Sequence, residues 1–586
     1  MIKISNSLIY LVPALFLFIL GILPFFHSDF FPMHDDTQPS RVQQMAESLR
    51  SGQFPVRWVG DLGYGYGYPL FNFYAPLPYY LGACFYLFGF TAITSAKIMI
   101  LIPILLSGVF MFILIKQLAG NSAAVLSSLL YIYAPYHAVN IYVRGAVGEL
   151  YAYAFFPLFF FGITKLIRVK ELKIEDVKIG ILTTTLGFAA ILLSHNILGM
   201  ITSIIAVFIL IIFALWMVIN RFTHLTSKRK KRNYSNVFFL LLFCFILTFS
   251  VSAFFTLPAF LEKSYTRVDQ LIKGGSDFRD HFVFPDQLWN SPWGFAGSAP
   301  GRQDGMSFKI GKVHLILGVL GFTNFLYQKL KEKIKLRLSV IYIISFIFFI
   351  FSVFMMLKLS QPFWELLPIL SFIQYPWRFQ NITLFSLSIL SSALFIGISK
   401  KYKLTLAVIG IAAVLVFNLK YFNPQTRIPV GDEDYISPKN LRNKISRISD
   451  EYLSKDFVIP QTEHGIVYAG LADTSSLRVK QLINTPTRKT YDVYAQKNTP
   501  IISQIAYFPG WEVIIDEKKA EIISNKGRIQ FDIEQGTHFV EFIFMDTPVR
   551  KISNTISFLS LLLLVYVSLK PRGPKLLGVF LSKHRR

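Results

Sequence analysis

The chain has 586 residues, of which 53% are hydrophobic and only 16% are charged, and its mean hydropathy is +0.48. Soluble proteins carry about 25% charged residues, so this composition excludes an ordinary soluble domain and indicates a lipid bilayer. The net charge of +25 does not indicate nucleic acid, because the Lys and Arg residues concentrate in short loops between apolar runs. The two cysteines, Cys84 and Cys244, lie in apolar stretches, which argues against a disulfide framework or a Cys-based zinc site.

Apolar runs near the length needed to cross about 30 Å of hydrocarbon recur along the chain. The first run predicts a retained anchor, because no small-residue cleavage site follows it. With shorter runs included, the pattern predicts roughly twelve transmembrane helices. The clearest runs are 8–26, 97–115, 197–219, 236–259, 338–357, 381–398, 404–419 and 552–569.

Basic loops mark the cytoplasmic side of a membrane protein. They predict that both termini are cytoplasmic and that the long polar stretches lie outside. Residue 70 is then outside and the basic loop at 165 inside, so the chain must cross the membrane an odd number of times between them. The Pro-rich stretch 71–90 is therefore expected not to cross, and residues 138–148 are expected to lie outside. The basic loops are 165–178, 228–232, 329–337, 400–403 and 570–586, and the polar stretches are 27–70, 261–311, 358–380 and 421–549.

The predicted fold is an all-α polytopic membrane protein with an extracytoplasmic β-sandwich-like domain. Residues 1–420 form the transmembrane domain, 421–549 the β-rich domain, and 550–586 a final span with a basic tail. Within the first outer loop, apolar residues at helical spacing predict an amphipathic helix over 38–50. Alternation of apolar and polar residues over 529–544 predicts a hairpin with one buried face.

The acidic pair in His34-Asp35-Asp36 precedes this first helix. Two carboxylates at a helix start stay ionised with help from the helix dipole. One could act as a general base, and the other could hold a metal ion or position a hydroxyl. The alternative is that Asp36 or Thr37 only caps the helix, which leaves Asp35 unexplained.

Several other polar motifs are expected on the same face, and each has a structural alternative. Arg144 and Glu149 could be a pair of side chains that extend from a helix end to the membrane surface. The His195-Asn196 turn could be a simple polar turn without a function. Arg378 could either anchor the chain at the membrane interface or bind a phosphate. The Gly63–Tyr68 repeat offers either aromatic faces for a sugar or a flexible loop. The loop Trp289–Gly311 could be a lid.

These stretches resemble the GT-C superfamily of membrane glycosyltransferases, and more closely the bacterial YfhO-like proteins, also labelled as related to 6-pyruvoyl-tetrahydropterin synthase. Nothing in the sequence suggests pterin chemistry. The resemblance spans nearly the whole chain. The residues that carry it are Tyr68–Tyr80, Arg144–Glu149, Pro376-Trp377-Arg378-Phe379 and Phe508–Trp511.

The resemblance implies transfer of a sugar from a polyprenyl-phosphate-linked donor, at the outer face of the bacterial cytoplasmic membrane, to an envelope polymer, lipid or protein. Asp35 or Asp36 would be the base, Glu149 a second acidic residue, and Arg378 the partner of the departing phosphate. The doublet is not a strict Asp-x-Asp. The resemblance therefore leaves open whether Asp35, Asp36 and His34 hold a Mg²⁺ or Mn²⁺ ion. The expected substrate-binding residues are Arg41, Tyr74, Arg144, His195, Asn196 and Arg378.

Two other functions remain open. A transporter or flippase of lipid-linked sugars usually places ionisable groups near the membrane midplane. The clear spans of this chain carry none there, which favours an enzyme. A non-catalytic scaffold for envelope assembly could keep every span and lack a working site.

Overall fold

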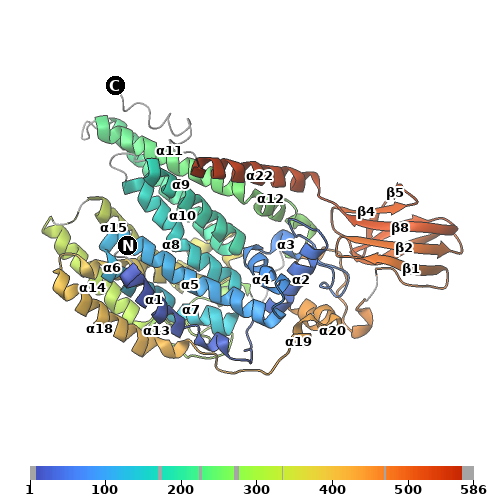
Figure 1. Ribbon diagram of the computed structural model, residues 1–586, viewed down its shortest axis with the longest axis horizontal. Helices are drawn as coiled ribbons and strands as arrows, with labels where there is room; N and C mark the ends of the chain where they lie inside the picture. Colours follow the sequence, from blue (N-terminus) through green and yellow to red (C-terminus); the bar gives the residue numbers. More distant parts are fainter. Residues whose placement is uncertain are drawn as a thin grey trace, which may run out of the picture.

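The computed structural model describes residues 8–168, 174–222, 228–268, 276–332, 334, 336–467 and 470–569. Figure 1 shows an elongated molecule in which a bundle of helices meets a region of β-strands at one end. The helices are α1 (Leu8–Leu20), α2 (Gln38–Arg50), α3 (Leu70–Phe73), α4 (Leu77–Leu87), α5 (Ala92–Ala119), α6 (Asn121–Ile132), α7 (Pro135–Val139), α8 (Val147–Arg168), α9 (Ile174–Ser194), α10 (Asn196–Phe222), α11 (Lys228–Val251), α12 (Ala253–Leu261), α13 (Pro285–Trp289), α14 (Lys312–Leu330), α15 (Leu336–Met356), α16 (Gln361–Leu366), α17 (Gln380–Ser392), α18 (Lys400–Asn418), α19 (Glu433–Ile436), α20 (Pro438–Asn440), α21 (Ser446–Ile448) and α22 (Pro548–Leu569).

The helices make this a multi-pass membrane protein. Within the described residues, seven helices are long and apolar enough to cross a membrane, and the bent pair formed by α11 and α12 would make eight. The predicted count of about twelve is therefore not confirmed, because several expected spans are short helices. The seven are α5, α8, α9, α10, α15, α18 and α22.

The short helices show where the apolar pattern misleads. The run 8–26 contains a helix of only 13 residues, α1, with Pro13 inside it. The run 381–398 contains α17, also 13 residues, which is followed by a short 3-10 helix. The run 236–259 bends by 71° at the break between α11 and α12. Apolar composition alone therefore does not show that a straight helix crosses the bilayer in these segments.

The helix that the sequence predicted in the first loop is present. Helix α2 covers residues 38–50, and Val42, Met45 and Ala46 on its apolar face are fully buried. The stretch 71–90 forms α3 and α4, and the 11 residues of α4 reach only about 16 Å, too short to cross.

The β region contains two antiparallel sheets, with orders β1-β2-β8-β4-β5 and β3-β7-β6. Their inner faces meet through apolar side chains such as Phe531 and Phe542, whose ring centroids are 5.6 Å apart. The segment 421–476 before the first strand contains only short helices and irregular chain among its described residues. The strands are β1 (Leu477–Asn484), β2 (Arg488–Ala495), β3 (Thr499–Ala506), β4 (Trp511–Ile515), β5 (Lys518–Ala520), β6 (Ile523–Asn525), β7 (Arg528–Ile533) and β8 (Gly536–Phe544).

The predicted hairpin over 529–544 is wrong in its pairing. Strand β7 pairs with β3 and β6, whereas β8 pairs with β2 and β4. The turn at Gln535-Gly536 therefore carries the chain from one sheet to the other. Alternation predicted which side chains are buried, because both strands turn apolar residues inward, but it does not determine which strand is the hydrogen-bonded neighbour.

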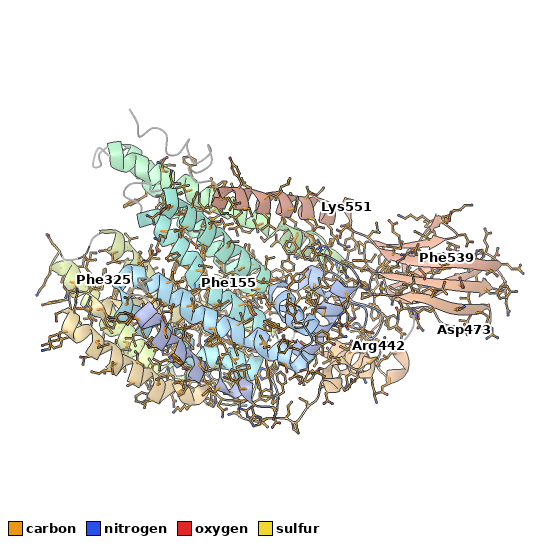
Figure 2. The ribbon with its side chains drawn as sticks, in the orientation of Figure 1. Phe155, Phe325, Arg442, Asp473, Phe539 and Lys551 are labelled. Carbon is orange, nitrogen blue, oxygen red and sulfur yellow. The ribbon has the colours of Figure 1, made fainter. Side chains whose placement is uncertain are left out.

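A buried polar cluster, here called the junction cluster, joins the helices to the β region. It consists of Arg57, Asn72, Glu262, Arg550 and Asn554. The Nε of Arg550 and the Nδ2 of Asn72 both donate to Glu262 Oε2, at 3.0 and 2.8 Å. Arg57 donates to Asn72 Oδ1 at 3.1 Å and to Asn554 Oδ1 at 2.8 Å. Figure 2 shows Lys551, next to Arg550, at the end of α22 nearest the strands.

Candidate functional site

A cavity of about 430 Å³ opens at the end of the bundle where α8 begins and α9 ends. Several residues that the sequence singled out line it, although they are far apart in the chain. Asp36, Arg41 and Asn196 are not among the lining residues. The predicted residues in the wall are His34, Asp35, Tyr74, Arg144, Glu149, His195 and Arg378.

Backbone pairing brings the acidic motif next to Arg144. The N–H of His34 donates to the carbonyl of Val143 at 2.9 Å, and the N–H of Asp35 donates to the carbonyl of Arg144 at 3.0 Å. The segments 34–35 and 143–144 are therefore neighbours at one end of the bundle. The crossing-parity argument predicted only that the two segments lie on the same side of the membrane, and the fold places Asp35 and Glu149 around one cavity.

Four donors hold the carboxylate of Asp35. Thr37 Oγ1 donates to Oδ1 at 3.0 Å, and Gln38 Nε2, Arg41 Nη1 and Tyr74 Oη donate to Oδ2 at 3.1, 3.1 and 3.3 Å. Arg41 is buried beneath it and lies 4.3 Å from the centroid of the Tyr74 ring. Arg41 thus orients Asp35 from below and does not itself face the cavity.

The helix-capping explanation for the acidic pair does not hold. The N-cap of α2 is Thr37, and no side chain caps the helix there. Asp36 accepts a hydrogen bond from the Tyr435 hydroxyl at 2.9 Å and lies 4.0 Å from Lys444 Nζ. Burial raises the pKa of Asp36, although Tyr435 and Lys444 oppose this. The two aspartates therefore have different surroundings, and only Asp35 faces the cavity.

Two arginines share one buried glutamate in the cavity wall. Glu149 is fully buried, its Oε2 accepts from Arg144 Nη1 at 2.9 Å, and Arg378 Nε lies 3.8 Å from the same oxygen. Its Oε1 accepts from the Tyr136 hydroxyl and from two asparagine amides. Glu149 therefore holds the guanidinium groups, and two positive charges against one negative charge leave the wall basic.

Aromatic rings line this basic wall. The guanidinium of Arg144 lies 4.5 Å from the centroid of a Trp377 ring, and that of Arg378 lies 4.9 Å from the Tyr375 ring. Tyr375 and Trp377 stack on each other at 4.9 Å. Stacked rings restrict the arginine rotamers while leaving N–H groups in the plane of the guanidinium to bind a ligand.

Close helix packing brings His195 to the same wall. A Cβ atom added at Gly148 would lie 2.3 Å from the carbonyl oxygen of Ser194, so only glycine allows α8 to start this close to the end of α9. His195 Nδ1 accepts the N–H of Leu198 at 3.2 Å. Its Nε2 therefore carries the proton, and the neutral ring is a hydrogen-bond donor. Asn196 instead donates to the carbonyl of Phe73 at 2.7 Å and stabilises the turn.

The sequence did not single out the residues that close the cavity from residues 276–311, here called the roof segment. His281, Gly297, Ser298 and Met306 of this segment line the cavity, and Phe295 packs against His34 with ring centroids 5.1 Å apart. The predicted lid, Trp289–Gly311, covers part of this segment. Its spacing gave no sign of His281, because that residue approaches the cavity only in the folded chain.

The Gly63–Tyr68 repeat is part of the core. Tyr64 and Tyr68 are buried, and their hydroxyls donate to Asp450 and Glu451 at 3.1 and 3.3 Å. A Cβ atom at Gly65 would lie 2.1 Å from a backbone carbonyl. These tyrosines therefore pack the first loop against the segment before the β region, and offer no open face to a sugar.

The residues expected to hold a metal ion do not fit one. Both oxygens of Asp35 already accept from N–H and O–H groups, and Asp36 is outside the cavity lining. Burial and the nearby Arg144 lower the pKa of His34, which favours its neutral form. In the part of the chain that the structure describes, no group of three or more His, Cys, Asp or Glu side chains could hold a metal ion.

Comparisons with known proteins give two similar solved structures. The crystal structure of the Archaeoglobus fulgidus oligosaccharyltransferase in its apo form is 13% identical, with a TM-score of 0.42, covering 80% of this chain and 62% of that one. The crystal structure of ArnT from Cupriavidus metallidurans bound to undecaprenyl phosphate is 11% identical, with a TM-score of 0.29, covering 68% of this chain and 78% of that one. This chain thus spans less than two thirds of the oligosaccharyltransferase.

No family model matches the sequence, and neither does any curated protein. Membership of the YfhO-like family stays a prediction.

Proposed function

We propose that the protein is a GT-C type membrane glycosyltransferase. It transfers a sugar from a polyprenyl-phosphate-linked donor to an acceptor in the cell envelope, on the extracytoplasmic face of the membrane. The observation that carries this proposal is the pair of guanidinium groups, Arg144 and Arg378, which share Glu149 in the same cavity as Asp35. A buried cationic wall with planar N–H donors suits a phosphate group.

The reaction needs two kinds of charge in one place, and the cavity has both. As the bond between the sugar carbon C1 and the phosphate oxygen breaks, its electron pair stays on the phosphate, where Arg144 and Arg378 stabilise the added negative charge. Positive charge develops on C1, and the carboxylate of Asp35 stabilises it. The acceptor oxygen forms a new bond to C1, and its proton passes to a base in the cavity wall.

The position of the cavity also favours an enzyme over the alternatives. Its lining residues lie at helix ends and in connecting segments, which is where a lipid headgroup and an envelope acceptor can meet. A scaffold has no need for a partly exposed carboxylate that four donors hold at a cavity. Both alternatives predict that the parent protein transfers no sugar from a lipid-linked donor.

Binding of the donor phosphate tests the proposal directly. The purified full chain in nanodiscs is titrated with undecaprenyl phosphate, and binding is followed by the fluorescence of Trp377 and the other tryptophans. Arg378→Lys replaces a planar fork by a point charge, so we expect at least tenfold weaker binding, about 1.4 kcal/mol. The same variant should slow transfer of radiolabelled sugar from undecaprenyl-phosphate-linked donors to an envelope fraction.

Arg302→Lys is the matched control. Arg302 is an exposed arginine of the roof segment that pairs with Asp286 at 3.3 Å. We expect it to bind undecaprenyl phosphate like the parent. If Arg378→Lys and Arg144→Lys also bind like the parent, the basic wall is not a phosphate site and the proposal is wrong.

A further inference from the structure

An exposed imidazole and an exposed aromatic ring meet at the opening of the cavity, and the proposal above gives a role to neither. His34 of the first loop lies in the cavity lining and is exposed. Phe295 of the roof segment is 42% exposed and packs against it, with ring centroids 5.1 Å apart and 57° between the ring planes. Gly297 and Ile448 are further exposed residues of the lining, so three distant parts of the chain converge at this opening.

Backbone hydrogen bonds hold both rings in place. Gln425, in the segment after α18, accepts from the N–H of Phe295 at 2.6 Å and donates to the carbonyl of Trp293 at 3.1 Å. On the other side, the N–H of His34 donates to the carbonyl of Val143 at 2.9 Å. The two rings therefore present a preorganised surface to a molecule that enters the cavity.

The ring nitrogens of His34 are open to such a molecule. Among the residues that the structure describes, neither nitrogen has a hydrogen-bond partner. Burial and, next, the charge of Arg144 lower the pKa of His34, so its ring is neutral at neutral pH. A neutral imidazole has one donor and one acceptor nitrogen, and a sugar hydroxyl likewise both donates and accepts. Phe295 adds an apolar face, on which the C–H groups of one side of a sugar ring can pack.

The backbone beside these rings does not suit a peptide acceptor. A peptide that binds by strand addition needs unpaired N–H and C=O groups on the protein. The N–H of Ala299 already donates to Asp304 at 2.9 Å. The carbonyl of Gly297 already accepts from Gly305 at 3.3 Å, and the N–H of Phe295 is taken by Gln425.

The lining is also a poor match for a hydrocarbon chain. Its aliphatic side chains are Ala146, Met306 and Ile448, and the other side chains in it are charged, polar or aromatic. The group that this opening accommodates is therefore polar, with one apolar face. A sugar ring fits that description.

We propose that His34 and Phe295 form an acceptor subsite that takes a sugar residue of an envelope glycan. This inference rests on the proposed glycosyl transfer and narrows its acceptor to a carbohydrate. One face of the acceptor sugar packs on the Phe295 ring, and its hydroxyls hydrogen-bond to the His34 imidazole. The acceptor then lies next to Asp35, in the same cavity as the two arginines assigned to the donor phosphate.

The product of the reaction tests the class of acceptor. Lipid-linked sugars are extracted from cells that make this protein and that are grown on carbon-13 glucose. The full chain in nanodiscs is given this extract together with an unlabelled envelope fraction, and mass spectrometry identifies the residue to which the labelled sugar is attached. We expect a glycosidic bond to another sugar. Attachment to an amino-acid side chain or to a lipid hydroxyl would overturn the proposal.

Substitutions at the two rings test the place of the subsite. Phe295→Leu and His34→Ala should each raise the half-saturating amount of envelope fraction about tenfold, because each removes one contact with the acceptor. Phe295→Tyr keeps the ring and should match the parent. His34→Gln should lose less than His34→Ala, because an amide both donates and accepts. The donor KM, the affinity for undecaprenyl phosphate and the melting temperature should stay at parent values in all four.

Two exposed residues of the same first loop supply the controls. His27 pairs with Asp29, and Phe54 lies beside Tyr80 with ring centroids 6.0 Å apart. His27→Ala and Phe54→Leu should retain the parent's half-saturating amount of envelope fraction.

The outcomes distinguish the two proposals. If the parent neither binds undecaprenyl phosphate nor transfers any labelled sugar, both are wrong. If it transfers sugar to protein or to a lipid hydroxyl, glycosyl transfer stands and the acceptor class is wrong. If the product joins two sugars but Phe295→Leu and His34→Ala saturate like the parent, the acceptor binds elsewhere. A fall in maximal rate alone would also overturn the subsite, because it would show that acceptor binding is unaffected.

Discussion

The aspartates of the acidic pair are neighbours in sequence, yet their side chains have different surroundings. Asp35 faces the cavity and pairs with buried Arg41 at 3.1 Å, whereas Asp36 contacts Tyr435 and Lys444 away from it. The sequence identified the pair but could not assign a separate role to each aspartate. The partner Tyr435 of Asp36 lies 399 residues later in the chain, so only the folded structure brings the two together. At the scale of single residues, stability and activity can therefore be separated by experiment.

The first prediction concerns the pair Asp35 and Arg41. Asp35→Asn leaves the charge of Arg41 buried without its anionic partner, so we expect a loss of about 3–5 kcal/mol in stability. Asp35→Asn/Arg41→Gln removes both charges and should recover much of the melting temperature. Sugar transfer should stay at least about 100-fold below the parent in both variants. A double variant that recovers transfer along with stability would show that Asp35 serves only as the partner of Arg41.

The second prediction concerns the pH dependence of stability at Asp36. Burial raises the pKa of Asp36 in the folded chain above its ordinary value of 3.8, so folding favours the protonated form. The stability that this provides is present below pH 3.8 and is lost as the pH rises through the folded pKa. Asp36→Asn, which is always neutral, should therefore gain melting temperature relative to the parent at pH 7.5 and lose that advantage toward pH 4. Asp280→Asn, at an exposed position, serves as the reference, and an advantage that grows on acidification would contradict the prediction.

At the scale of whole elements, the cavity depends on how closely α8 and α9 approach. The amphipathic pattern predicted α2 with its observed boundaries, because burial of one helical face follows directly from residue spacing. The same reasoning could not predict the contact between Gly148 and Ser194, which depends on how two separate helices dock. It also missed His281, whose place in the cavity is set by the fold of the roof segment.

The third prediction tests the close approach of α8 and α9. In Gly148→Ala, the new Cβ would lie 2.3 Å from the Ser194 carbonyl oxygen, so the helices must separate. We expect a loss of about 1–3 kcal/mol in stability, together with weaker binding of undecaprenyl phosphate, because Glu149 and His195 move apart. Thermal melting and ligand titration measure the two effects. Gly431→Ala, where a Cβ meets nothing within 4 Å, is the control.

At the scale of the whole molecule, the β region and the cavity should lie on the extracytoplasmic side. The fourth prediction uses single cysteines in a Cys84→Ala background, because Cys84 is exposed and Cys244 is buried. Ser475→Cys in the β region should react with an impermeant maleimide added to intact cells. Lys331→Cys, just after α14, should react only after the membrane is opened. The opposite pattern would reverse the orientation and contradict the prediction from basic loops.

The junction cluster also sets an order of events during synthesis. Arg57 is synthesised early and hydrogen-bonds to Asn554, which lies 497 residues later in α22. Glu262 likewise pairs with Arg550 of α22. Until α22 enters the membrane, Arg57 and Glu262 remain charged groups without these partners. A chain released by the ribosome before α22 lacks Arg550 and Asn554, so Arg57 and Glu262 keep only Asn72 as a partner within the cluster. The contacts that join the helices to the β region therefore form only after α22 has been made, and a chain that lacks α22 differs chemically at this point from one that has it.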